Sequence, residues 1–521
     1  MKRRSFLAAT GASLLARPAL ALSDTKTLRF VPDSNLASID PVWNLIPVTR
    51  NHAMLVWDML FGRDANFIPQ PQMVQSHEIT PDNLLWRFTL RQNLLFHDNT
   101  PVRATDCLAS IRRWAGRRPL GQRLLALATE MTATGDRSFE IRLRKPFPRM
   151  TYALSEFCFI MPERIARTDP NTRIAEAIGS GPYRFVASEW VSGDRAVYTR
   201  FEQYQPRPEP PSFTAGGKIA NFDRIEWHII PDPATAAAAL QENEIDWLQQ
   251  PQSDLLPLLK ANNQVTVLNN DKVGVMGMLA LNHLHPPFDN PKLRAAILSA
   301  IDQKDFMAAA AGDDPAMSLT PVGFFTPNMP MANDAGMAAL TAPRDLARSR
   351  AKVAESGYNG EPALVMGAAD SPVTQAMAQV AADLFRQLGL NVDYVSMDLG
   401  TLVQRRANQE TPDKGGWSAF TTTYEGLTMA DPATNVGLRG NGTGAWFGWP
   451  TSPMLESLRE QWLDTPDLPT QQSIAAKIQA TALQEVPFIP LGQIFYPTAI
   501  RTGIEGIIPS PFPIFWNARK T

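Results

Sequence analysis

The sequence predicts an α/β protein made of more than one structural unit. Its 521 residues are enough for two or three domains of roughly 150 residues each. Several segments have the pattern of a helix followed directly by a strand, which is typical of α/β architecture. Hydrophobic residues make up 44% and charged residues 19%, as in ordinary globular proteins. This composition excludes a disordered or fibrous chain.

The clearest helix and strand pair lies near residue 380. Apolar residues recur there at the spacing of one buried helix face, namely at Val373, Met377, Val380, Leu384 and Leu388. Gly389 stands where a helix commonly ends, and a strand is predicted over residues 390–395. The same patterns predict helices over residues 345–355, over residues 233–242 and from Pro291 onward, and strands over residues 363–366 and 245–248.

The region from about residue 67 to residue 148 has a different pattern of apolar and polar residues. Residues 85–90 and 138–143 alternate apolar and polar side chains, which predicts strands with one buried face. We therefore expect a strand-rich insertion here. Segments rich in proline and glycine, residues 205–217 and 320–343, predict long surface loops.

The first residues have the order of an export signal. Arg3 and Arg4 precede an apolar stretch over residues 6–15, and small residues end at Ala21. The twin arginines favour the Tat route, with an ordinary Sec signal as the alternative. Cleavage is expected after about Ala21. No later stretch approaches the ~18 apolar residues of a membrane span, so the sequence predicts a soluble periplasmic protein.

Charge and cysteine content exclude further classes. The 49 basic and 51 acidic residues leave a formal net charge of −2, which offers no excess for binding nucleic-acid phosphates. The arginine run at residues 112–118 is expected to be the solvated face of a helix. Cys107 and Cys158 allow one disulfide at most, and we expect buried free thiols, since cysteine is often a small core residue.

No catalytic motif is found in the sequence. There is no Gly-x-Ser-x-Gly elbow, Walker loop or His-Glu-x-x-His helix, and the glycines at residues 440–444 predict an ordinary loop. The histidine pair His283 and His285 could share a metal on an extended strand, but loop hydrogen bonding is the favoured role. The prediction is therefore no catalytic residue, no metal site and no cofactor.

Aromatic residues in predicted loops suggest a binding cleft. Trp43, Trp417 and Tyr424 offer large apolar faces with a polar tip, which suits a ligand-lined cleft. Core packing is the alternative for each of them. A large exported α/β chain with many aromatics and no catalytic set suits a solute receptor.

Several motifs resemble those of the periplasmic substrate-binding proteins of peptide, nickel and opine ABC transporters, called family 5 solute-binding proteins. The strongest match is Phe-His-Asp-Asn-Thr-Pro at residues 96–101, within the segment from residue 85 to residue 106. Asn99 replaces the usual glycine and remains compatible with a left-handed turn. The other matching segments are residues 179–185, 242–247, 287–302 and 485–490.

The resemblance implies a large, type II-like periplasmic-binding-protein fold, with two lobes and an α+β subdomain inserted in lobe I. It implies a cleft that closes by hinge motion and docking of the liganded protein on permease subunits in the inner membrane. The expected segments are residues 1–21 for the signal, 22–66, 174–270 and 488–521 for lobe I, 67–173 for the inserted subdomain, and 271–487 for lobe II.

The resemblance also points to Tyr424 and Asp431 in a pocket segment of lobe II. Dipeptide-binding members hold the ligand's amino group with an aspartate in this segment and its carboxylate with an arginine after a lobe II strand. Here Leu427, Thr428 and Met429 stand near the aspartate position, and no arginine occurs between residues 364 and 379. A buried unpaired terminus is costly, which disfavours a dipeptide clamped at both ends.

The predicted function is therefore a monomeric periplasmic receptor that binds a peptide-like or other organic solute and delivers it to an ABC importer. The predicted ligand-binding residues are Tyr424, Asp431, Trp417, Trp43 and Asn44. Tyr424 is expected to stack on the ligand, and Asp431 to bind it or to hold the pocket loop. Oligopeptides, opines, glutathione-like conjugates, haem and metal chelates remain open as ligands. The competing function is a cell-envelope hydrolase with an unrecognised site.

Overall fold

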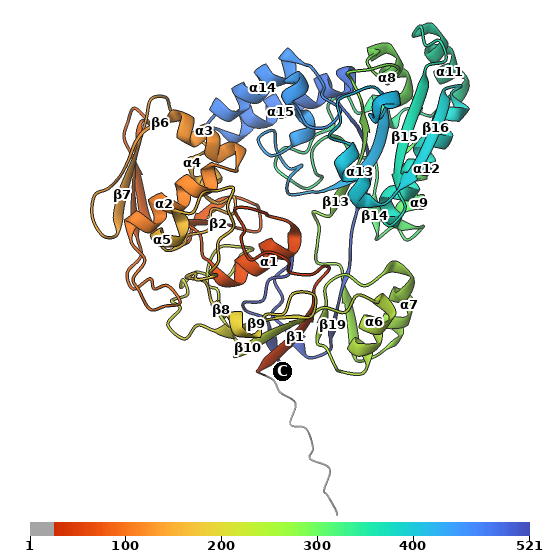
Figure 1. Ribbon diagram of the computed structural model, residues 1–521. Coiled ribbons are helices and arrows are strands. Elements are labelled where there is room, and N and C mark those ends of the chain that lie inside the picture. Colours follow the sequence, from red (N-terminus) through yellow and green to blue (C-terminus); the bar gives the residue numbers. More distant parts are fainter. Residues whose placement is uncertain (1–25) are drawn as a thin grey trace, which may run out of the picture.

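The computed structural model describes residues 26–521, so the predicted export signal lies outside the described residues. The chain forms three bodies in Figure 1: a small strand-and-helix body at the left, a sheet with its helices below, and a larger α/β body at the upper right. The body at the left is the inserted subdomain of lobe I, the body below is the rest of lobe I, and the body at the upper right is lobe II. The predicted two-lobed α/β architecture is confirmed.

The lobe I sheet has seven strands in the order β12-β19-β11-β1-β10-β9-β8. Its strands are β1 (Thr27–Val31), β8 (Tyr183–Phe185), β9 (Arg195–Arg200), β10 (Arg224–His228), β11 (Trp247–Leu248), β12 (Val265–Leu268) and β19 (Thr498–Arg501). The helices of this lobe are α1 (Pro47–Val56), α6 (Pro233–Gln241) and α7 (Leu256–Ala261), and its two short ladders are β2 (Phe61–Arg63) with β3 (Pro69–Pro71) and β20 (Ile504–Glu505) with β21 (Arg519–Lys520). Short 3₁₀ turns lie at Ala187–Glu189 and Ser253–Leu255.

An aromatic core joins the two ends of the chain within lobe I. Phe30 of β1 contacts Trp227 and Trp247 from the neighbouring parallel strands, with ring centroids 5.5 and 5.6 Å apart. Phe515 packs edge-on against Phe30 at 4.9 Å. Because aromatic side chains bury large apolar areas, this cluster holds the C-terminal segment in lobe I.

The inserted subdomain has a four-stranded antiparallel sheet in the order β4-β5-β7-β6. Its elements are β4 (Val74–Ile79), β5 (Leu85–Leu90), α2 (Ala104–Ala115), α3 (Pro119–Leu127), β6 (Ala128–Ala133), β7 (Ser138–Leu143), α4 (Met150–Leu154) and α5 (Glu163–Ala166). The strands β5 and β7 span the residues predicted from the alternation, although the neighbouring Leu85 and Trp86 of β5 are both buried. The inward side chains of the two strands form the subdomain core, as a period of two requires.

The arginine run on α2 is not entirely a solvated face. Arg113 is buried and pairs with the buried carboxylate of Asp40 at 2.7 Å, whereas Arg112 is exposed. The pair ties the inserted subdomain to the loop after β1. The expectation that Arg113 is solvated is therefore wrong. Helical spacing predicts the helix face on which a residue lies, but it does not predict that a charged residue from a distant segment, here Asp40, packs against that face.

Lobe II has a six-stranded sheet in the order β14-β18-β13-β17-β15-β16. Its strands are β13 (Val275–Leu281), β14 (Ser318–Leu319), β15 (Pro362–Ala368), β16 (Asn391–Met397), β17 (Ala419–Glu425) and β18 (Ile489–Ile494). Its helices are α8 (Pro291–Leu298), α9 (Gln303–Ala311), α10 (Ala338–Thr341), α11 (Leu346–Glu355), α12 (Pro372–Gln387), α13 (Leu399–Arg405), α14 (Pro453–Asp464) and α15 (Leu468–Glu485). Short 3₁₀ turns lie at Pro412–Lys414, Val436–Leu438 and Gly442–Gly444.

The helix predicted near residue 380 is confirmed as α12. Met377 and Leu384 are buried on its inner face, and Gly389 follows it with φ of +91°, a conformation that glycine adopts without steric cost. The strands β15 and β16 that flank α12 run parallel. This βαβ unit is the arrangement that the helix-then-strand pattern indicates.

Two short segments connect lobe I with lobe II. The first, residues 269–274, runs from β12 to β13, and the second, residues 495–497, runs from β18 to β19. Because β18 pairs with β13 and β14, residues 489–494 lie in lobe II, and their predicted assignment to lobe I is wrong. The apolar composition of β18 suits either sheet, so only the pairing partner decides its lobe.

Both cysteines lie buried in the inserted subdomain as free thiols, as expected from the sequence. Burial raises the pKa of both Cys107 and Cys158. Within residues 26–521, no helix has the length and apolar character that crossing a membrane requires.

Candidate ligand-binding site

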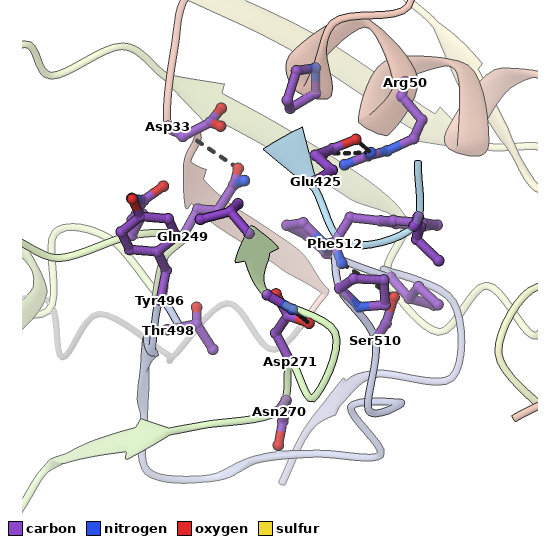
Figure 2. A pocket seen from close by; sticks show the side chains of 18 of the residues that line it. Asp33, Arg50, Gln249, Asn270, Asp271, Glu425, Tyr496, Thr498, Ser510 and Phe512 are labelled. Atoms are coloured by element: carbon purple, nitrogen blue, oxygen red, sulfur yellow. Dashed lines mark hydrogen bonds and ion pairs between the residues drawn. The ribbon is translucent and has the colours of Figure 1, made fainter. Parts of the chain in front are cut away.

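A cavity of about 160 Å³ lies at the hinge between the two lobes. Residues from both lobes and from both connecting segments form its walls (Figure 2). The lining residues are Asp33, Pro47, Arg50, Trp247, Gln249, Gln250, Asn270, Asp271, Gly274, Val275, Glu425, Leu427, Tyr496, Thr498, Ile507, Ile508, Ser510, Pro511, Phe512, Pro513 and Ile514. Rotation of one lobe about the hinge therefore changes the shape of this cavity.

Two parallel strands of lobe I bring together the polar residues Asp33 and Gln249 on one side of the cavity. Since β1 and β11 run parallel, their carboxyl ends lie side by side, and Asp33 and Gln249 follow these ends. The backbone N–H of Asp33 donates to Gln249 Oε1 at 3.2 Å. Ligands commonly bind at the carboxyl ends of strands in open α/β sheets.

The opposite wall comes from the ends of two lobe II strands, β13 and β17, that lie nearest the hinge. Glu425 is the last residue of β17 and lies opposite Val275, the first residue of β13, in the antiparallel register. The end of one strand and the start of the other therefore meet beside the first connecting segment. Leu427, two residues beyond Glu425, also lines the cavity.

An ion pair crosses the cavity between the lobes. Arg50 on α1 donates from Nη1 to both carboxylate oxygens of Glu425, at 2.6 and 2.7 Å. The Arg50 side chain is only 3% exposed, and its guanidinium lies 4.4 Å from the centre of the Phe512 ring. Arginine over an aromatic face is a favourable cation–π arrangement, so this contact holds the guanidinium in place.

A tight turn in the first connecting segment positions Asp271. Its Oδ1 accepts hydrogen bonds from the backbone N–H groups of Val273 and Gly274, both at 2.8 Å. Gly274 has φ of +53°, and a Cβ there would lie 2.4 Å from the carbonyl oxygen of Ile494, the last residue of β18. Glycine at this position therefore allows the first connecting segment to pack closely against the end of β18, where the second connecting segment begins.

The pKa values of the two cavity aspartates, exposed Asp33 and half-buried Asp271, shift in the same direction. Desolvation raises the pKa of Asp33, and the negative charge of Glu425 raises it further while Arg50 opposes the shift. Desolvation likewise raises the pKa of Asp271, again with Glu425 raising and Arg50 lowering it. The pKa of each aspartate therefore depends on the charges of both Arg50 and Glu425.

The C-terminal segment supplies most of the apolar wall. Phe512 stands between Pro511 and Pro513, and Ile507 and Ile508 precede it. Phe512 is buried against the lobe I core, and its backbone N–H donates to Ser510 Oγ at 3.2 Å. The cavity thus combines an apolar side with a charged side, as small-molecule sites commonly do.

The lobes also contact each other away from the hinge. Tyr152 on α4 donates a hydrogen bond to Asp431 Oδ2 in lobe II. Arg123 on α3 and Lys145 after β7 both pair with Asp464 at the end of α14, at 2.8 and 2.6 Å. The inserted subdomain and lobe II therefore meet through polar contacts, which corresponds to a closed arrangement of the lobes.

Among the predicted site residues, Asp431 has the loop-holding contacts. It is 4% exposed, and its Oδ1 accepts hydrogen bonds from the N–H groups of Ala433 and Thr434 at 2.8 and 3.1 Å. Tyr424 is half-buried and packs edge-on against Trp446, with ring centroids 5.5 Å apart. Neither residue lines the hinge cavity, and a direct ligand contact for either stays a prediction.

The tryptophans predicted to line the cleft lie elsewhere. Trp417 has no exposed surface, donates from Nε1 to the carbonyl of Arg406 at 3.0 Å and packs against Phe420. Its expected exposure to a ligand is wrong, because it follows the turn into β17 and points into the lobe II core. Trp43 and Asn44 line a separate polar hollow of about 340 Å³ beside α2 and α3, away from the hinge cavity.

The side chains of His283 and His285 have separate surroundings and do not share one site. His283 is largely buried, and desolvation lowers its pKa to about 3. His285 is directed to the carbonyl of Gln409, with Nε2 at 2.7 Å. Among residues 26–521, no cluster of histidine, cysteine and carboxylate side chains has the composition and spacing of a metal site.

Sequence reasoning did not identify the charged residues of the hinge cavity. Glu425 stands directly after Tyr424, and alternation along a strand places these two side chains on opposite faces. Asp33 follows β1, a strand that was not predicted from the sequence; recognising that strand would have pointed to Asp33, since ligands commonly bind at strand carboxyl ends. Arg50, Asp271 and Phe512 carry no local signal, because their roles depend on segments far apart in the chain.

Comparison with known proteins agrees with this architecture. Residues 69–444 match the family model described as bacterial extracellular solute-binding proteins, family 5 middle. A probable peptide ABC transporter periplasmic-binding protein of Sinorhizobium fredii is 36% identical over 519 residues, which cover 98% of this chain and 97% of the relative.

Solved structures show the same fold. The ABC transporter substrate-binding protein CtaP of Listeria monocytogenes superposes with a TM-score of 0.78 at 20% identity, covering 96% of this chain and all of its own. A dipeptide-binding protein from Pseudoalteromonas sp. SM9913, in complex with Met-Leu, superposes with a TM-score of 0.76 at 19% identity, covering 95% and 100%. The motifs, the two-lobed fold and the extent of these matches lead to one conclusion: the chain belongs to the family 5 bacterial extracellular solute-binding proteins.

Proposed function

We propose that this protein is a periplasmic receptor that binds a peptide-like organic solute in the hinge cavity and delivers it to the permease subunits of an ABC importer. The observation that carries the proposal is the cavity at the two connecting segments, walled by both lobes and crossed by the Arg50–Glu425 pair. A ligand that touches both walls stabilises the closed arrangement, because it binds that state more tightly than the open one.

The peptide-like character of the solute rests on the Sinorhizobium relative, whose name describes a probable peptide transporter component. Glutathione-binding proteins are also related, at 25% identity over 434 residues for the one from Pectobacterium atrosepticum. Export by the Tat route, with cleavage near Ala21, and a monomeric state belong to the same proposal. Each has a direct test, namely N-terminal sequencing of the periplasmic protein and light scattering of the purified chain.

The main experiment is a thermal-shift screen of the mature protein against peptides, opines, glutathione conjugates, haem and metal chelates. A solute that binds only the native state raises the melting temperature as its concentration increases. X-ray scattering of the same samples should show a smaller radius of gyration with ligand than without it. A screen in which no solute gives a saturable shift would contradict the proposal.

The competing function, a cell-envelope hydrolase, predicts consumption of the ligand. The receptor returns its ligand chemically unchanged after denaturation of the complex, which mass spectrometry of the recovered solute measures. The described residues of the cavity include no serine, histidine and carboxylate set of the kind that acyl transfer uses. Release of cleaved product at a steady rate would favour the hydrolase.

A further inference from the structure

The hinge cavity is lined by more negatively charged than positively charged side chains. Three carboxylates and one guanidinium line it: Asp33, Asp271, Glu425 and Arg50. Arg50 and Glu425 neutralise each other as a close ion pair. Asp33 and Asp271 form no ion pair with any described residue, and Lys272 beside Asp271 is exposed and does not line the cavity.

Both unpaired carboxylates have hydrogen-bonding capacity left. The two backbone N–H groups that bond Asp271 both reach Oδ1, and no described residue donates to its Oδ2. Within residues 26–521, the Asp33 carboxylate accepts a side-chain hydrogen bond only from the hydroxyl of Ser34, at 3.2 Å. In Figure 2, Asp33 and Asp271 stand at opposite ends of the cavity, with the Arg50–Glu425 pair and Phe512 along one side between them. Each end therefore offers a free acceptor.

Asp33 is exposed and Asp271 half-buried, and neither carboxylate has a cationic partner among residues 26–521. Partial desolvation by the surrounding walls raises the pKa of both aspartates, and Glu425 raises each further. A bound cation would offset this desolvation through charge-assisted hydrogen bonds. A carboxylate entering the cavity would meet two like charges, and the single guanidinium is already bonded to Glu425.

The apolar wall defines the rest of the ligand. Phe512, Ile508 and the flanking prolines give a surface suited to an aliphatic chain, while the acidic groups lie at its ends. Lysine and arginine side chains have this composition, with an apolar stem and a cationic tip. Neutral aliphatic side chains would fill the same surface but leave both carboxylates unpaired.

We propose that the hinge cavity selects basic, peptide-like solutes, with Asp33 and Asp271 binding two cationic groups of the ligand. This inference rests on the proposed receptor function and specifies its substrate class. Asp33 lies in lobe I, after the carboxyl end of β1, and Asp271 lies in the first connecting segment. A ligand with two positive charges would therefore contact both lobe I and the hinge.

A charge series of matched probes tests the inference by isothermal titration calorimetry. Alanyl-lysine amide carries two positive charges, alanyl-norleucine amide one, and N-acetyl-alanyl-norleucine amide none, while the aliphatic stems are nearly the same. We expect the affinity to rise about tenfold with each added charge, as for a hydrogen-bonded charge pair in a partly buried site. A neutral probe that binds as tightly as the dication would overturn the inference.

Isosteric variants then assign the charges to residues. D33N and D271N should each lower the affinity for alanyl-lysine amide about tenfold, and the double variant should bind the three probes equally. Asparagine keeps the Oδ1 acceptor that the turn at residue 271 uses, so the fold is preserved, and the melting temperature of each free variant verifies this. The matched control is D254N, because Asp254 is exposed in lobe I and does not line the cavity.

The outcomes separate this inference from the receptor function. If neutral or acidic solutes saturate the protein while the basic probes do not, the charge selection is wrong and the receptor function stands. If neither the basic probes nor the wider solute screen produces saturable binding, both are wrong. If the basic probes bind but D33N and D271N behave as D254N does, the assigned residues are wrong.

Discussion

Arg50 and Glu425 join the two lobes through one guanidinium nitrogen that contacts both carboxylate oxygens within 2.7 Å. Arg50 lies on α1 of lobe I and Glu425 ends β17 of lobe II, so the pair links the two lobes beside the hinge. Phe512 fixes the guanidinium from the lobe I side. The ion pair is therefore both an interlobe contact and a structural element of the cavity.

Substitution Glu425→Gln should shift the free protein toward open forms. Loss of one charge removes about 1 kcal/mol from the closed state, a value expected for a partly exposed pair, and lowers ligand affinity about fivefold. Small-angle scattering should give a larger radius of gyration. The matched control is Glu140→Gln, which breaks the Arg87–Glu140 pair within the inserted subdomain sheet and should leave both quantities unchanged. An unaltered radius for Glu425→Gln would show that the pair does not govern closure.

Binding of the basic probe should depend on pH. Since partial desolvation raises the pKa of Asp33 and Asp271, lowering the pH protonates them earlier than an aspartate with the ordinary pKa of about 3.9. The lysine amine stays protonated throughout, so affinity for alanyl-lysine amide should fall as the pH decreases from 7 toward 4. Calorimetry across this range measures the effect. The D33N/D271N double variant should show a flat profile, and an equally steep profile in that variant would assign the titration to other groups.

The Tyr152–Asp431 hydrogen bond should affect all ligands alike. Asp431 holds the loop through Ala433 and Thr434 and faces Tyr152 across the lobe boundary. Tyr152→Phe removes the interlobe hydrogen bond and leaves the loop bonds intact, so affinities for basic and neutral probes should fall by the same factor, about twofold to tenfold. Asp431→Asn should behave likewise. A loss confined to amine-bearing probes would instead identify Asp431 as a direct ligand contact.

Tyr424 should contribute to stability through its contact with Trp446. Tyr424→Ala removes a half-buried ring from lobe II and should destabilise the free protein by about 2 kcal/mol, with little change in affinity for the cavity probes. Tyr424→Phe keeps the edge-on ring contact and should melt close to the wild type. Calorimetric melting and titration on the same samples separate the two effects. Weaker binding with an unchanged melting temperature would support stacking of Tyr424 on the ligand.

The two cysteines should remain unreactive until the protein unfolds. Both thiols are buried, and burial raises the pKa of each, so the reactive thiolate form is scarce at neutral pH. Titration with Ellman's reagent should detect no thiol in the native protein and two in denatured, unreduced protein. A count of zero after denaturation would establish a disulfide between Cys107 and Cys158.

Local pattern was sufficient for much of the fold. The strands β5 and β7 follow from alternation of apolar and polar residues, and α12 follows from the spacing of its buried face and from Gly389. These features depend on residues within one helix or strand, where backbone geometry alone sets the period of two or 3.6. The family motifs are likewise continuous stretches of chain, so the two-lobed architecture and the receptor class could be predicted from them.

The ligand site itself was decided by tertiary structure. Asp33, Arg50, Asp271, Glu425 and Phe512 come from five separate segments, and they meet only because β1 pairs with β11, β13 pairs with β17, and the C-terminal segment returns to lobe I. For the same reason the sequence did not distinguish Trp417, a core residue, from a cleft residue. Composition and spacing report what a side chain can do, whereas its burial and its partners depend on contacts between residues hundreds of positions apart.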